Sequence, residues 1–69
     1  MTERELEVLH LVAAGRSNGQ IGQALFISRK TASVHISNIL RKLGVSNRIE
    51  AAAIATNNAR YRPQLADEI

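Results

Sequence analysis

Apolar residues in this chain recur every three or four positions in four separate stretches, a spacing that places them on one face of an α-helix. No stretch shows the strict alternation of apolar and polar residues that marks a half-buried strand. Two of the stretches open with a capping box, in which a hydroxyl residue is followed three positions later by Glu or Gln. These pairs are Thr2 with Glu5 and Ser17 with Gln20. The sequence therefore predicts an all-α fold.

The remaining helix ends are marked by residues of the same kinds. Gly15 suits the left-handed residue that ends a first helix. Ser28 is expected to cap a third helix over residues 29–43, and Gly44 to end it. A fourth helix is expected to start after Ser46. We predict a compact bundle of four helices.

The connection between the second and third predicted helices is short, with about three residues outside helix. Its apolar residues Leu25, Phe26 and Ile27 are expected to pack under the corner, and Gly22 to permit close approach of the neighbouring helix. This arrangement is typical of a helix-turn-helix, whose second helix enters the major groove of DNA. We therefore predict that the third helix is a recognition helix, although short helical hairpins also occur in structural bundles.

Size and composition exclude several classes of protein. A chain of 69 residues forms one small domain, which we place at residues 1–60, followed by a polar and frayed tail at 61–69. The absence of Cys excludes disulfides and thiolate chemistry, and two aromatic residues are too few for a base-stacking RNA-binding sheet. His10 and His35 stand on separate helices and make no metal site. The longest apolar run, at residues 51–55, is too short to span a bilayer. We expect a cytoplasmic binding protein without catalytic site, cofactor or metal.

Positive charge is concentrated in the middle of the chain. The net charge is +3, but residues 11–49 contain six Lys or Arg residues and no carboxylate. These cations therefore lack nearby partners in the sequence, and an external polyanion is the natural counter-charge. The alternative is that they are ordinary solvated surface cations.

The composition of one face of the predicted third helix favours the interpretation that the cations bind an external polyanion. With about 100° per residue, it consists of Lys30, Val34, Ser37 and Arg41, with Ser33 and Asn38 beside it. The opposite, apolar face consists of Ala32, Ile36, Ile39 and Leu43. Small uncharged side chains between two cations let a helix enter the ~12 Å major groove while the cations meet phosphates.

Several motifs occur together and in order along residues 1–57. They are Thr2-x-Arg4-Glu5-x-Glu7-Val8-Leu9, Ala14-Gly15-x-Ser17-Asn18-x-x-Ile21, Leu25-x-Ile27-Ser28-x-x-Thr31, His35-x-x-Asn38-Ile39, Lys42-Leu43-x-Val45, Arg48 and Ala51-Ala52. Each motif is weak by itself, but the series resembles the DNA-binding domain of LuxR/FixJ-type (GerE-like) bacterial transcription regulators. The resemblance implies a third helix in the groove, a fourth helix that pairs two subunits on DNA, and a sensor or receiver domain in a longer parent chain.

The resemblance also implies roles for single residues. Phosphate-contacting or helix-positioning roles fall on Ser28, Thr31, Asn38 and Lys42, with Asn18 as a weaker candidate. Positions that face base edges in relatives are occupied by Ser33, Val34 and Ser37. Many relatives carry Lys at the first of these positions and some at the last, so we expect modest direct readout of the bases.

Three elements stay open at this stage. In the fourth helix, one face is expected to cover the core and a second to pair subunits, unless its alanines merely favour helix. The core face is Ile49, Ala52, Ala53 and Thr56, and the pairing face is Ala51, Ile54, Ala55 and Asn58. Arg48 is expected to pair with Glu50 or with a phosphate. His35 is expected to be a packed histidine, with a phosphate contact as the alternative.

The sequence thus predicts sequence-specific binding of double-stranded DNA by a homodimeric transcription regulator. The alternative is a small helical module that binds another protein and never contacts nucleic acid. Binding to random duplex DNA distinguishes the two hypotheses.

Overall fold

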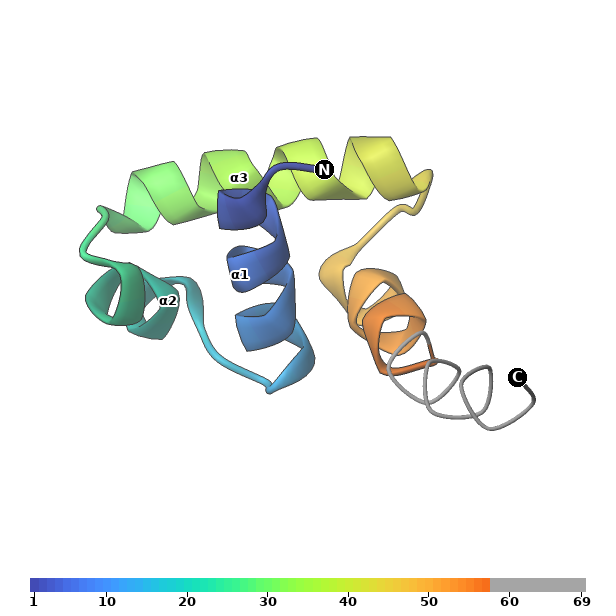
Figure 1. The fold of residues 1–69 in the computed structure, drawn as a ribbon, viewed down its shortest axis with the longest axis horizontal. Coiled ribbons are helices and arrows are strands. Elements are labelled where there is room, and N and C mark those ends of the chain that lie inside the picture. Colours follow the sequence, from blue (N-terminus) through green and yellow to red (C-terminus); the bar gives the residue numbers. More distant parts are fainter. Residues whose placement is uncertain (58–69) are drawn as a thin grey trace.

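The computed structural model describes residues 1–57, which form helices and no strands. In chain order these are α1 (Glu3–Ala13), α2 (Asn18–Leu25), α3 (Arg29–Leu43) and a fourth helix at residues 48–57. The long helix α3 lies along one side, and the other three helices lie on the same side of it (Figure 1). The predicted all-α class is confirmed, while the predicted tail at 61–69 lies outside the described residues.

Both predicted capping boxes are present. At the start of α1, Thr2 Oγ1 accepts a hydrogen bond from the Glu5 amide at 3.1 Å, and the Thr2 amide donates to Glu5 Oε1 at 2.9 Å. At the start of α2, Ser17 Oγ accepts from the Gln20 amide at 3.1 Å, and the Ser17 amide donates to Gln20 Oε1 at 2.9 Å. Each box satisfies amides that have no partner inside the helix.

The ends of α3 also lie where the sequence predicts them. Ser28 Oγ accepts from the Thr31 amide at 2.9 Å, so the first turn is capped. Gly44 follows the last turn with a φ of 70°, the left-handed conformation that glycine adopts without a steric cost. Both ends of α3 are therefore capped.

The core is small and formed mainly by aliphatic residues from all four helices. Its buried residues are Val8, Leu9, Val12, Ile21, Ala32, Ile36, Ile39 and Ala51. The predicted apolar face of α3 is buried along most of its length, and Leu43 packs against the core at its end. This burial turns the opposite face of α3 outward.

The turn between α2 and α3 differs from the prediction at one residue. Leu25 and Ile27 pack against the core as expected, but Phe26 is 95% exposed and has a left-handed φ of 58°. Gly22 permits a close approach, since a Cβ there would lie 2.6 Å from the Ile27 carbonyl oxygen. The neighbour at this point is the backbone of the turn, and the Ile27 amide donates to the Gly22 carbonyl at 2.9 Å.

The predicted faces of the fourth helix are wrong except at Ala52, which packs against the core as expected. Ile49, expected to cover the core, is 78% exposed, whereas Ala51, expected to pair subunits, is 1% exposed and belongs to the core. Ala55 also packs against the core, and Ala53 is exposed. Alanines lie on several sides of this helix, so its apolar pattern alone does not predict which side is buried.

Candidate nucleic-acid interface

The exposed face of α3 brings together the residues that the sequence placed there. Lys30, Ser33, Val34, Ser37 and Arg41 are all exposed. Within residues 1–57, the two cations of this face form no ion pair with a carboxylate. The face therefore presents a positive charge at each end to the solvent.

The middle of this face offers groups that can read bases. Val34 is 52% exposed and presents two methyl groups, which suit contact with a thymine methyl. The hydroxyls of Ser33 and Ser37 can donate and accept hydrogen bonds. Asn38 lies beside them and is half-buried.

The first turn of α3 carries two exposed hydroxyl residues. Besides capping the helix, Ser28 Oγ donates a hydrogen bond to Thr31 Oγ1 at 2.8 Å. The predicted capping role of Ser28 is confirmed, while its predicted role toward DNA stays a prediction. Thr31 stays exposed next to it.

Lys42 differs from the other predicted contacts because it has a partner within the chain. Its Nζ lies 2.8 Å and 3.0 Å from the two carboxylate oxygens of Glu5, which is 5% exposed. The expectation that the basic stretch lacks internal partners is therefore wrong at this residue. The ion pair ties the start of α1 to the last turn of α3.

The same contact changes the acidity of Glu5. The hydrogen bond from the Lys42 ammonium, followed by the one from the Thr2 amide, lowers the pKa of Glu5 from 4.5 to about 2. Glu5 thus serves the cap and the ion pair at once. The capping box was visible in the sequence, but the partner 37 residues away was not.

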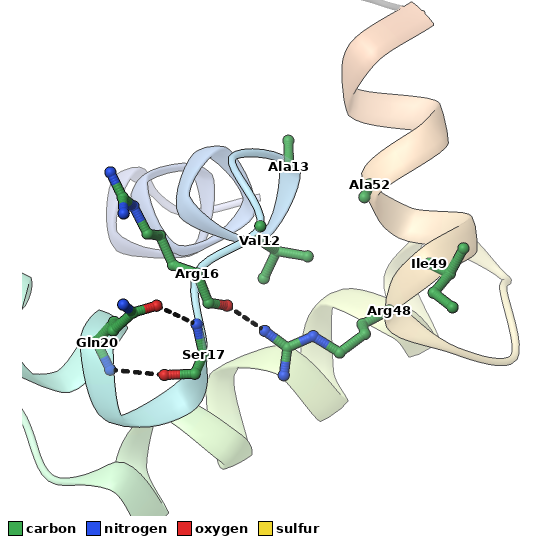
Figure 2. Close-up of a pocket in the computed structure, with 9 residues that line it drawn as sticks. Val12, Ala13, Arg16, Ser17, Gln20, Arg48, Ile49 and Ala52 are labelled. Carbon is green, nitrogen blue, oxygen red and sulfur yellow. Dashed lines mark hydrogen bonds between the residues drawn. The ribbon is translucent and has the colours of Figure 1, made fainter.

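Arg48 does not pair with Glu50, one of the two partners expected from the sequence, and a phosphate contact stays a prediction. Its Nη1 donates to Asn18 Oδ1 at 2.6 Å and its Nη2 to the Arg16 carbonyl at 2.7 Å. Glu50 instead accepts from the Ser46 amide at 2.8 Å, so the expected pairing of Arg48 with Glu50 is wrong. Figure 2 shows Arg48 reaching from the fourth helix to the loop before α2.

The same bonds hold Asn18, the weaker phosphate candidate, at the start of α2. The side-chain oxygen Oδ1 of Asn18 accepts the hydrogen bond from Arg48, and the residue is half-buried. Its amide group can still donate elsewhere. Asn18 therefore joins the helix-turn-helix to the fourth helix, a role that the sequence did not indicate. His35 is half-buried on α3, and both interpretations of it stay predictions.

An open groove of about 470 Å³ lies away from α3, between the end of α1 and the fourth helix. Val12, Ala13, Ile49 and Ala52 supply its apolar lining, and Arg48 lies at its side (Figure 2). Over residues 1–57, no group of three or more His, Cys, Asp or Glu side chains is placed to hold a metal ion. None of the helices described there is long and apolar enough to cross a bilayer.

Comparison with known proteins decides the family. The pattern of the family described as GerE, bacterial regulatory proteins of the luxR family, matches residues 1–55. The chain belongs to this family. The resemblance seen in the sequence is thereby confirmed, and the membership supports a part in DNA-binding transcription regulation.

Similar proteins carry regulatory names. The chain is 53% identical over 58 residues to the transcriptional regulatory protein LiaR of Bacillus subtilis, covering 84% of this chain and 28% of LiaR. It is 54% identical over 54 residues to the nitrate/nitrite response regulator protein NarP of Escherichia coli, covering 78% of this chain and 25% of NarP. This LuxR-family chain thus spans about a quarter of the length of these relatives.

Proposed function

We propose that this LuxR-family chain binds double-stranded DNA sequence-specifically, as the output domain of a bacterial transcription regulator. The observation that carries the proposal is the exposed face of α3, where Lys30 and Arg41 form no ion pair within residues 1–57. Such a face lacks a counter-charge among residues 1–57, and a duplex supplies one phosphate charge per ~1.7 Å of helix axis.

Binding follows from the arrangement of this face. The helix enters the major groove, Lys30 and Arg41 contact phosphates, and the exposed hydroxyls of Ser28 and Thr31 bind the backbone near the first turn. The side chains between them read base edges, with Val34 against a thymine methyl. Because Ser33 and Ser37 are short and uncharged, part of this readout passes through water.

Dimerisation on DNA uses the fourth helix in this proposal, but not the face expected from the sequence. Ala51 is buried in the core, Ile54 and Ala55 are half-buried, and Asn58 lies outside the described residues. The exposed side instead presents Ile49 and, one turn later, Ala53. A homodimer through this side would bind two half-sites ~34 Å apart.

The parent chain and the compartment complete the proposal. The matched relatives are about four times longer than the matched part, and NarP is named a response regulator. We infer a sensor or receiver domain in a longer parent chain, with a non-catalytic role for this domain. Since its ligand is the bacterial chromosome, it acts in the cytoplasm.

Fluorescence anisotropy with a random-sequence duplex tests the proposal at several salt concentrations. The wild-type chain should bind, with affinity that falls steeply as salt rises. Arg41→Ala and Lys30→Ala should each reduce the slope of log K against log salt by about 0.9, the value for one phosphate contact. Absence of binding at any accessible concentration would instead favour a protein-interaction module.

A further inference from the structure

Five of the six cations of residues 11–49 lie on α3 or at the start of the fourth helix, and the sixth, Arg16, is exposed in the loop between α1 and α2. Lys42 and Arg48 bind partners inside the molecule, while Lys30 and Arg41 stand on the exposed face of α3. Arg29 belongs to neither group. It is the first residue of α3, it is exposed, and it forms no ion pair within residues 1–57.

The guanidinium of Arg29 lies against the first turn of α2 at Gly19. A Cβ at Gly19 would lie 3.1 Å from Arg29 Nη2 and 3.5 Å from Nε, so the glycine leaves the space that the guanidinium fills. The backbone of Gly19 does not require glycine, since its φ is not among the positive values of this chain. A larger side chain at position 19 would thus remove the space that the Arg29 guanidinium occupies.

This placement directs the Arg29 guanidinium toward the phosphate backbone of the DNA. In a helix-turn-helix, the first helix of the motif crosses the DNA backbone while the second lies in the groove. Arg29 starts on α3, and its side chain packs against α2. It therefore lies where the DNA backbone would pass between the two helices. Arginine is suited to this position because its planar fork can bind two phosphate oxygens at once.

We propose that Arg29 binds a backbone phosphate of the DNA, and that Gly19 positions its guanidinium for this contact. The inference rests on the proposed function and adds a contact to it. It also distinguishes Arg29 from Lys42, which carries the same charge but has a carboxylate partner within the chain.

Arg29→Gln tests the contact, with Arg4→Gln as its matched control. Both substitutions remove one arginine charge, but Arg4 lies on α1, where it pairs with Glu7 at 3.6 Å. With a random-sequence duplex, Arg29→Gln should reduce the salt slope by about 0.9 and weaken binding several-fold at low salt. Arg4→Gln should keep the wild-type slope. Circular dichroism and thermal unfolding check that both variants fold.

Gly19→Gln tests the positioning without removing a charge. Its side chain would occupy the place of the Arg29 guanidinium, so the slope should fall toward that of Arg29→Gln. The double variant should have the same salt slope as Arg29→Gln alone, because the contact that Gly19→Gln disturbs is already absent.

The outcomes separate this inference from the proposed function. If the wild-type chain binds duplex DNA and Arg29→Gln has the same slope as Arg4→Gln, Arg29 contacts no phosphate and the inference is wrong. If Gly19→Gln keeps the wild-type slope, Gly19 does not position Arg29. If the wild-type chain does not bind DNA, the proposed function itself is wrong.

Discussion

Arg41 and Lys42 are exposed neighbours in the last turn of α3, but they differ in their ion pairing. Arg41 is exposed and forms no ion pair within residues 1–57, whereas Lys42 binds both oxygens of a buried carboxylate. One cation is free for a ligand and the other holds two helices together. The comparison shows that a basic stretch in a sequence overstates the charge that a folded surface offers, because the fold can supply partners from distant residues.

The largest expected difference between the two residues is in stability. Lys42→Met should lower the midpoint of thermal unfolding by about 5 °C, because Glu5 then stays buried with its charge unpaired. Arg41→Gln should leave the midpoint nearly unchanged, since exposed residues without such contacts contribute little. Thermal unfolding followed by circular dichroism measures both at neutral pH. Equal midpoints for the two variants would contradict the division of roles.

The Glu5–Lys42 pair should also make stability depend on acid. The pKa of Glu5 is lowered in the folded chain to about 2 from 4.5, so its ionised form favours the folded state. That contribution is present above pH 4.5 and is lost as the pH falls from 4.5 toward 2. Unfolding midpoints of the wild type and Glu5→Gln, measured from pH 7 to pH 2, should therefore converge at the acid end.

The exposed Glu3 provides the control for this experiment. It lies in the first turn of α1, two residues from Glu5, and Glu3→Gln removes the same charge. Its midpoints should follow those of the wild type across the acid range. A constant gap between wild type and Glu5→Gln down to pH 2 would mean that the ion pair does not stabilise the fold.

The features predicted from sequence are those fixed by local contacts. Caps such as Thr2 with Glu5 join residues three positions apart, so the sequence shows both partners together. The ends of α3 follow from the same kind of signal at Ser28 and Gly44. The buried face of α3 follows from its apolar spacing, and with it the exposed face.

The features that the sequence did not predict depend on contacts between residues on different helices. Lys42 and Glu5 are 37 residues apart, and no local pattern joins them. The buried side of the fourth helix could not be predicted, because alanines on several sides give the helix no dominant apolar face, and the Arg48–Asn18 bond joins residues 30 positions apart. The position of the Arg29 guanidinium could not be predicted, because it depends on the space left next to Gly19 on another helix.

The smallest expected effect concerns the middle of the α3 face, between its two cations. Val34→Ala removes methyl groups that are half exposed, so the fold should be preserved. Losing a thymine contact should cost about 1 kcal/mol at the preferred site, roughly a fivefold loss in affinity, with little change on random DNA. Competition between a selected duplex and a random one measures this ratio. Arg41→Ala should weaken both duplexes alike, and an equal loss of affinity for both duplexes in Val34→Ala would show that Val34 reads no base.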